Sequence, residues 1–259
     1  MSAKSSSSSS AVNAWVLEYW CQSRRPLASL AFVLPLLALY EGGVILLGAQ
    51  AVRNGADVWL RQILDLLGFG QYFLLPALTV AVLLAWHHVT RDRWRLSAGV
   101  LYVMFAECAV LALVLLGVGK LQGMLVRTLV APQPAVAEIC LAVPWLLAGR
   151  GALLGRLLGF VGAGVYEEML FRLLLLPPVA VCAERLGAQR NVRIASAVLL
   201  TSALFAAAHY LGPHGETFDA FSFWFRFAAG AFFAVLFVYR GFGIVAGTHA
   251  LYDIFVSLG

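Results

Sequence analysis

Two adjacent carboxylates and an arginine lie inside a stretch of sequence that is otherwise apolar. The segment reads GVYEEMLFR and contains Glu167, Glu168 and Arg172. In a helix of 3.6 residues per turn, Glu168 and Arg172 share one face and can form an ion pair, whereas Glu167 is turned by about 100° away from that pair. A carboxylate without a cationic partner in low dielectric is suited to general-base chemistry.

Two further apolar segments carry the other groups that a hydrolytic site needs. LFAAAHY places Phe205 and His209 one helical turn apart, and the three alanines between them allow another helix to approach. GTHALYD places His249 and Asp253 four residues apart, on one helical face. One carboxylate, two histidines and an aspartate supply a proton acceptor, a second base and polarising groups, which together indicate hydrolysis.

The same residues also fit a structural polar network. Buried carboxylates, histidines and an arginine can satisfy one another and fix how helices pack. For any one residue alone this interpretation is favoured, whereas the whole set favours catalysis. Arg226, in FWFRFAAG, could neutralise a carboxylate of the site or bind the carboxyl terminus of a substrate, but we predict a structural pair with Glu107 or Glu41.

Composition indicates the setting in which these residues must meet. The chain has 259 residues, of which 62% are hydrophobic and 12% charged, so it is predicted to be an integral membrane protein. Its apolar runs approach the ~20 residues that a transmembrane helix needs. We therefore expect an all-α polytopic bundle of about seven to eight spans plus interfacial helices. The expected spans are 27–47, 72–86, 98–118, 157–176, 194–211, 221–239 and 244–258.

The segments between these spans complete the expected organisation. Residues 49–70 interleave charges with apolar residues and predict an amphipathic interfacial helix. Residues 119–150 are expected to form a connector with an interfacial or re-entrant helix, and an extra crossing at 136–149 would give the eighth span. Pro177 and Pro178 predict an end or a kink of the fourth span. Glu167 and His209 can lie at the same depth in the membrane only if the fourth helix continues past the proline pair or the fifth helix begins before its expected start at residue 194.

Three parts of the chain are expected: 1–26, an N-terminal cytoplasmic tail and pre-span segment; 27–156, an N-terminal transmembrane region; and 157–259, a catalytic helical core. The serine run at the start predicts a short disordered tail, not a cleaved signal peptide.

Basic loops at 89–97 and 183–193 place the amino terminus in the cytoplasm. The net charge of +5 is thus a topology signal, and no nucleic-acid partner is expected. The four scattered cysteines predict neither disulfides nor a thiolate metal site.

The three motifs resemble those of the CPBP intramembrane endopeptidases, a family that includes the CAAX prenyl endopeptidases and many bacterial proteins labelled Abi. GVYEEMLFR resembles the EExxxR motif, LFAAAH the FxxxH motif and GTHALYD the HxxxN/D motif, in that order over about residues 157–256. The resemblance implies hydrolysis of a peptide bond within a membrane-embedded cavity.

The resemblance also implies roles for individual residues. The water-activating pair of the family corresponds to Glu167 and His209, the oxyanion-stabilising pair to His249 and Asp253, and the supporting residues to Glu168, Arg172 and Phe205. The last motif position often carries Asn, which can donate a hydrogen bond, whereas an ionised Asp only accepts. Asp253 is therefore expected either to be protonated or, more simply, to orient His249 through a ring nitrogen.

Two mechanisms stay open. In the glutamic version, Glu167 is the general base and no cofactor is needed; in the alternative, His209, His249 and Glu167 hold Zn²⁺. The sequence has no HExxH, so such ligands would come from separate helices, and we favour the metal-free version.

Other interpretations of the function are a non-enzymatic membrane immunity or scaffold protein and a proton-coupled transporter, although no inverted repeat is visible. Acyl or prenyl transfer lacks an identifiable nucleophile.

The expected partners are the lipid bilayer and a membrane-anchored protein or peptide substrate. The expected location is the plasma (inner) membrane of a prokaryote, where protein prenylation is not expected. A prenylated CAAX protein would be the substrate in a eukaryote, so in a prokaryote a membrane-anchored peptide or the remnant of a sorting signal is expected instead.

Overall fold

The computed structural model describes residues 14–48, 51, 53–129, 150–212 and 215–258, and every regular element within them is a helix. The predicted all-α class is therefore confirmed. In chain order the elements are α2 (Pro26–Leu47), α3 (Gly55–Leu66), α4 (Leu74–Thr90), α5 (Ala98–Leu129), α7 (Arg150–Gly162), the π-helical segments η2 (Ala163–Glu167) and η3 (Met169–Leu175), α8 (Leu176–Arg185), α9 (Arg190–Ala208), α10 (Ala220–Arg240) and α11 (Phe242–Leu258).

Four helices of the described part are long and apolar enough to cross a membrane, namely α2, Ala98–Val126 of α5, α9 and α10. The helices α4 and α11 are apolar but shorter. Large apolar side chains such as Leu46 and Tyr102 are exposed on the outer surface, where a bilayer would cover them. An all-α membrane bundle is thus confirmed, whereas the count of seven to eight crossings stays a prediction.

Helix α5 is longer than predicted. It continues to Leu129, well past the predicted end at residue 118, so the first part of the predicted connector is helical. The rest of that connector, residues 130–149, holds the predicted re-entrant helix and Cys140 and lies outside the described residues.

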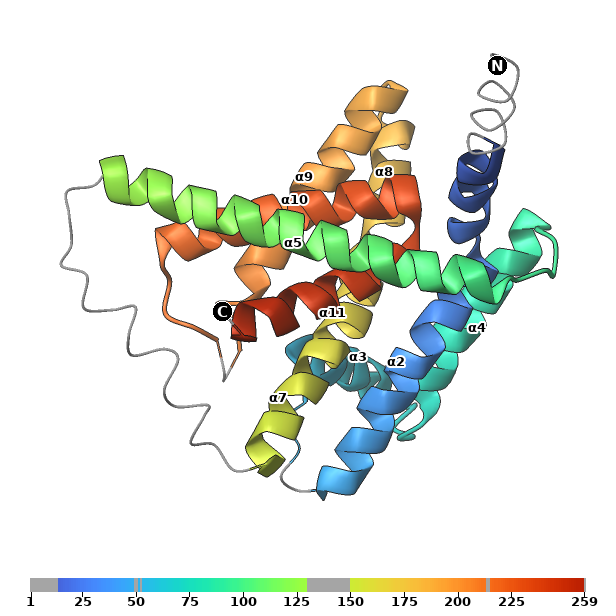
Figure 1. Cartoon of the computed structure of the whole chain (residues 1–259), viewed down its shortest axis with the longest axis horizontal. Coiled ribbons are helices and arrows are strands. Elements are labelled where there is room, and N and C mark those ends of the chain that lie inside the picture. Colours follow the sequence, from blue (N-terminus) through green and yellow to red (C-terminus); the bar gives the residue numbers. More distant parts are fainter. Residues whose placement is uncertain (1–13, 49–50, 52, 130–149, 213–214, 259) are drawn as a thin grey trace, which may run out of the picture.

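Helix α11 is the central helix of the fold. Every residue from Phe242 to Ala250 is buried, and the helix packs most extensively against α5, with α2, α10 and η2 also against it (Figure 1). Its small residues permit this crowding. A Cβ atom at Gly247 would lie 2.6 Å from the Phe32 ring of α2, so only glycine fits there. The second histidine motif is therefore carried by the most enclosed helix.

The chain from Arg150 to Arg185 is one continuous helical path, which is the yellow segment beside α11 in Figure 1. Its middle part is wound as a π-helix, a form with i→i+5 hydrogen bonds that occurs often at functional sites. The helical path does not end at the proline pair, so of the two predicted outcomes, an end or a kink, the kink is the one that stays a prediction. Pro177 and Pro178 lie in the first turn of α8, directly after the π-helical winding.

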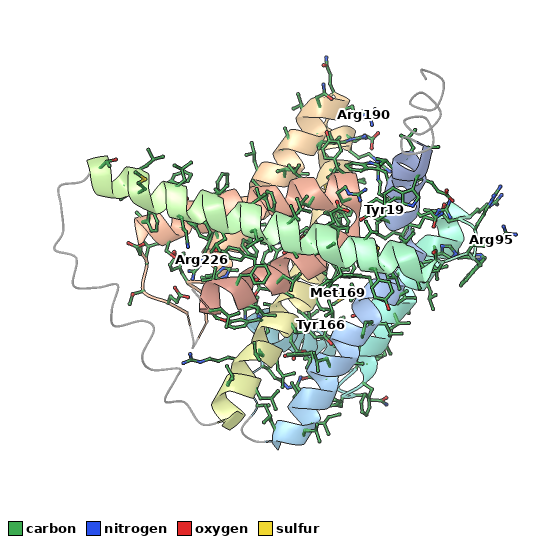
Figure 2. All side chains as sticks on the ribbon, in the orientation of Figure 1. Tyr19, Arg95, Tyr166, Met169, Arg190 and Arg226 are labelled. Atoms are coloured by element: carbon green, nitrogen blue, oxygen red, sulfur yellow. The ribbon has the colours of Figure 1, made fainter. Side chains whose placement is uncertain are left out.

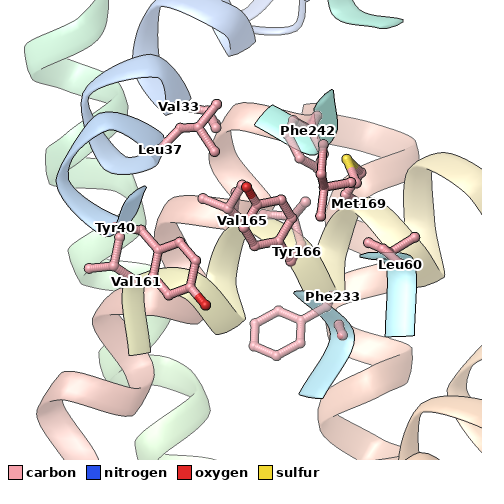
Figure 3. Close-up of a cluster of buried hydrophobic side chains, with 14 of the residues drawn as sticks. Val33, Leu37, Tyr40, Leu60, Val161, Val165, Tyr166, Met169, Phe233 and Phe242 are labelled. Atoms are coloured by element: carbon pink, nitrogen blue, oxygen red, sulfur yellow. The ribbon is translucent and has the colours of Figure 1, made fainter. Parts of the chain in front are cut away.

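The core joins this helical path to the amino-terminal part of the chain. Tyr40 of α2 and Tyr166 of η2 are completely buried and pack edge to face, with ring centroids 5.5 Å apart, beside Leu60 of α3 and Phe233 of α10 (Figure 3). At Gly162 a Cβ atom would lie 2.3 Å from the Tyr40 ring. This close approach fixes the position of the glutamate pair along α2.

Helix α3 forms within the segment predicted to be amphipathic, but its charges do not all face outward. Asp57 is completely buried, where it accepts hydrogen bonds from Arg53, from Arg61 and from the Tyr40 hydroxyl. Arg61 also pairs with Glu41 at 2.9 Å. The interpretation of these charges as a polar face on the membrane interface is therefore wrong for Asp57, because neighbouring cations and a tyrosine compensate its burial.

Candidate active site

Three segments distant in sequence bring the motif residues together. The π-helical path supplies the glutamates, α11 supplies His249 and Asp253, and the end of α9 supplies Phe205 and His209. The close approach depends on Gly164, because a Cβ atom there would lie 2.5 Å from the Ala246 carbonyl oxygen on α11. Figure 2 shows Tyr166 and Met169, which flank the two glutamates, in the middle of the bundle.

The predicted depth relation between the first two motifs is confirmed. The fourth helical path continues past the proline pair, and α9 begins at Arg190, before the predicted start at residue 194. Both adjustments raise His209 and Glu167 toward a common level.

Glu168 and Arg172 form the predicted ion pair, with Arg172 Nε 3.1 Å from Glu168 Oε2. Both side chains are completely buried. Arg172 also donates a hydrogen bond from Nη2 to the carbonyl oxygen of Gly230, at 3.0 Å. Its guanidinium faces the ring of Phe205 at 4.5 Å from the centroid, so that a cation–π contact adds to the pair.

Glu168 has a second partner that the sequence did not indicate. Its Oε1 lies 2.7 Å from Nδ1 of His249. Asp253, which was expected to orient His249, lies 3.6 Å from Nε2 of that ring, which is longer than a hydrogen bond. The expectation is therefore wrong in this respect, because the helix that carries Glu168 stands close enough to α11 to occupy the Nδ1 side of the imidazole.

Aromatic rings hold the two histidines. Phe233 stacks on His249 with centroids 4.6 Å apart and planes 14° from parallel. Phe205 presents an edge contact to both His249 and His209, at centroid distances of 6.0 and 5.0 Å. Nδ1 of His209 lies 2.9 Å from the Phe205 carbonyl oxygen, so a proton on Nδ1 leaves Nε2 as an acceptor. Phe233 was not singled out by the sequence, since one aromatic residue among many in α10 carries no signal.

Glu167 faces a different environment from that of its neighbour. Its Oε2 lies 3.9 Å from Nε2 of His249, and its Oε1 accepts a hydrogen bond of 2.9 Å from the side-chain amide of Asn54. The side chain of Glu167 keeps 14% exposure, whereas that of Glu168 has none. No salt bridge to Arg or Lys reaches Glu167 within the described part of the chain. It is therefore the carboxylate of the pair that remains available.

Asn54 is a site residue that sequence reasoning missed. Its position before Gly55 and Asp57 fits a helix N-cap, and its Oδ1 does accept a hydrogen bond from the backbone N–H of Ala56. Nothing in the sequence indicates a contact with Glu167, which is more than a hundred positions away.

The predicted partner of Arg226 is wrong. Arg226 binds Glu216 at 2.7 Å, in the segment between α9 and α10, whereas Glu107 pairs with Arg240 and Glu41 with Arg61. Arg226 stands near the start of α10, about four turns from Arg240. The arginine at the far end of the helix therefore meets Glu107. Hydrogen bonding from Arg226 holds the pKa of the Glu216 carboxyl below its usual range.

The alternative zinc ligands do not converge in this arrangement. No group of three His, Cys, Asp or Glu side chains among the described residues is placed to hold one metal ion. One nitrogen of His249 faces Glu168, and His209 stands across the Phe205 ring from His249. The described residues as placed do not fit a three-ligand zinc site.

One family of known proteins matches the part of the chain that carries the three motifs. Residues 149–255 match the family model described as "Type II CAAX prenyl endopeptidase Rce1-like". This part of the chain is therefore a domain of the Rce1-like family, as the resemblance of the three motifs to CPBP endopeptidases predicted. The family supports a protease, and together with the apolar helices a membrane protein. No curated protein and no solved structure matches the chain.

Proposed function

We propose that this protein is a glutamic-type intramembrane endopeptidase that hydrolyses a peptide bond in a membrane-anchored protein or peptide. The observation that carries the proposal is the division between two adjacent glutamates. Glu168 is enclosed between Arg172 and His249, whereas Glu167 keeps an exposed oxygen that faces Nε2 of His249. An ionised carboxylate without a cationic partner is the group that can accept a proton from water.

In the proposed reaction, Glu167 takes a proton from a water molecule, with His209 as the second base. The water oxygen forms a bond to the carbonyl carbon of the scissile peptide, and the carbonyl oxygen becomes an oxyanion. His249 donates Nε2–H to that oxyanion. The carbon–nitrogen bond then breaks, and the proton held by Glu167 passes to the leaving amine. The carboxylate of Glu168 at Nδ1 fixes the orientation of the imidazole, so that Nε2 faces Oε2 of Glu167.

The test compares the wild type with Glu167→Gln, which keeps the shape of the side chain but cannot accept a proton from water. General-base catalysis contributes about 10²–10⁴-fold, so hydrolysis should fall by that factor while the thermal unfolding midpoint stays close to that of the wild type. Proteomics of membrane fractions from cells with either form should reveal a substrate that accumulates uncut with Glu167→Gln. Wild-type turnover by this variant would overturn the assignment of the base.

The metal-free version of the proposal needs its own measurement. Hydrolysis should survive exhaustive chelation, and the purified protein should contain no stoichiometric zinc. One zinc per chain, lost together with activity and restored by Zn²⁺, would favour the zinc-dependent alternative. Hydrolysis absent from the wild type, with equal loss of folded protein in Glu167→Ala and His209→Ala, would instead favour a non-enzymatic immunity or scaffold protein.

A further inference from the structure

The amino-terminal part of the chain contributes a side chain to the site. Asn54 lies outside residues 149–255, the part that matches the protease family, yet its Nδ2 donates a hydrogen bond of 2.9 Å to Oε1 of Glu167. The sequence motifs do not include this residue. Its contact is with the one carboxylate that the proposed reaction uses as a base.

The amide of Asn54 is fixed in orientation. Its Oδ1 accepts a hydrogen bond of 2.9 Å from the backbone N–H of Ala56, which caps α3. The cap requires the oxygen on that side, so the amide nitrogen must face Glu167. The backbone N–H of Asn54 donates to the Tyr40 hydroxyl at 3.2 Å, and that hydroxyl donates to the buried Asp57. Both neighbours are completely buried, so the start of α3 is held from two sides.

A neutral donor suits the neighbour of a general base. The guanidinium of Arg172 neutralises Glu168, and a second cation at Glu167 would likewise weaken its tendency to accept a proton. An amide directs the carboxylate without cancelling its charge. With Oε1 bound to Asn54, the remaining oxygen, Oε2, is the one that faces Nε2 of His249.

We propose that Asn54 is a positioning residue, which orients the carboxylate of Glu167 from the amino-terminal part of the chain. The inference rests on the proposed function, since it assigns Asn54 to the same reaction. Besides Asn54, the side chain with a contact to Glu167 within the described residues is His249 on α11, at 3.9 Å. Asn54 is the neutral hydrogen-bond donor of the two.

The test uses substitutions that separate the cap from the contact with Glu167. Asn54→Ser and Asn54→Asp both keep an oxygen that can cap α3, but neither keeps the amide donor, and the aspartate places a negative charge beside Glu167. Asn54→Ala loses the cap as well. Hydrolysis is measured in lipid–detergent micelles on a fluorogenic peptide that spans the cleavage site of the substrate found to accumulate uncut with Glu167→Gln, together with the thermal unfolding midpoint of each variant.

If Asn54 positions Glu167, kcat falls about 10–100-fold in Asn54→Ser and further in Asn54→Asp, while KM and the unfolding midpoint stay near those of the wild type. If Asn54 only caps α3, the loss follows the midpoint instead, so that Asn54→Ala alone is impaired. That second pattern would overturn the inference. A wild type and a Glu167→Gln variant with equal rates would instead overturn the proposed function, whatever the Asn54 variants do.

A measurement without substrate completes the test. A double-mutant cycle on thermal unfolding combines Asn54→Ser with Glu167→Ala, and non-additive effects are expected because the two side chains are in contact. Additive effects would contradict the hydrogen bond itself. Non-additive effects together with a wild-type kcat in Asn54→Ser would leave the contact in place but reduce it to a structural one, which also overturns the inference.

Discussion

Two neighbouring residues of the same type have separate environments in this site. Glu168 is completely buried and contacts Arg172 and His249, so its charge is compensated on both sides. Glu167 has a neutral donor, Asn54, and a partly exposed oxygen. A one-residue step along the helical path is thus enough to give the two carboxylates different partners.

This separation predicts stability effects of very different size at the two positions. Glu168→Gln leaves the buried guanidinium of Arg172 without its anion, and removal of one partner from a buried pair costs about 3–5 kcal/mol. Glu167→Gln should change the free energy of unfolding little. Thermal or denaturant unfolding in detergent measures both. Adding Arg172→Met to Glu168→Gln should recover much of the loss, and an equal loss in both single variants would contradict the division.

At the scale of single residues, the sequence could predict contacts within one helix but not between helices. The pair Glu168–Arg172 follows from its spacing, because i and i+4 share a face in any helical winding near the α form. The contact of Glu168 with His249 and the hydrogen bond from Asn54 depend on how three helices cross. The predicted partner of Arg226 was wrong for the same reason, since the charged residues in a sequence do not show which end of a helix contacts which neighbouring helix.

At the scale of elements, the site depends on the approach of η2 to α11. Gly164 is the contact point, where a Cβ atom would lie 2.5 Å from the Ala246 carbonyl oxygen and 2.8 Å from the Ala250 backbone nitrogen. Backbone atoms cannot move aside as a flexible side chain can. The distance between Glu167 and His249 is therefore set by a residue that carries no functional group.

The variant Gly164→Ala should push η2 away from α11. Overpacking of this kind costs about 1–3 kcal/mol, and hydrolysis should fall as well, because Glu167 moves with η2. Gly159→Ala is the matched control on the same helical path, since a Cβ atom there meets nothing within 4 Å. It should leave activity unchanged and raise stability by about 0.5–1 kcal/mol. The measurements are the thermal unfolding midpoints and the hydrolysis rates of the two variants. Equal effects of the two substitutions would contradict the tight contact between Gly164 and α11.

The existence of most of the helices could be predicted, because runs of apolar residues mark helices clearly, whereas some ends, such as that of α5, lay well beyond the predicted ones. The π-helical winding around the glutamates could not be predicted, since no pattern of apolar residues distinguishes it from an α-helix. The burial of Asp57 in α3 could not be predicted either. An amphipathic pattern gives a polar face, but only the fold shows that Asp57 on that face meets Arg53, Arg61 and Tyr40.

At the scale of the whole molecule, contacts of charged residues join the two ends of the chain. Arg240, at the end of α10, makes a two-armed pair with Glu107 of α5 at 2.6 Å for each arm. Glu107 also accepts a hydrogen bond from Tyr19, in the helical residues 14–23. Arg240 donates to Ser23 and its guanidinium lies 3.8 Å from the ring centroid of Trp20. The amino-terminal helix is thus fixed beside the turn that connects α10 to α11.

This arrangement predicts which surfaces share one side of the membrane. The residues 14–23 and the turn between α8 and α9 lie toward the same end of the molecule (Figure 1), and both are followed by arginines. Arginine-rich segments stay in the cytoplasm. Cys21 and Cys182 are exposed at this end, whereas Cys108 is buried. In a variant with Cys108 and Cys140 replaced by alanine, a membrane-impermeant maleimide should therefore label both remaining cysteines from the cytoplasmic side only.

The control comes from the opposite end of α9, which is long and apolar enough to cross the membrane. Phe218 is exposed in the segment after this helix, so Phe218→Cys, in a background without the native cysteines, should react from the other side. Labelling is compared in right-side-out and inverted vesicles. Because one crossing separates Cys182 from residue 218, labelling of both from the same side would contradict α9 as a span. Labelling of Cys21 and Cys182 from opposite sides would contradict the orientation inferred from the basic segments.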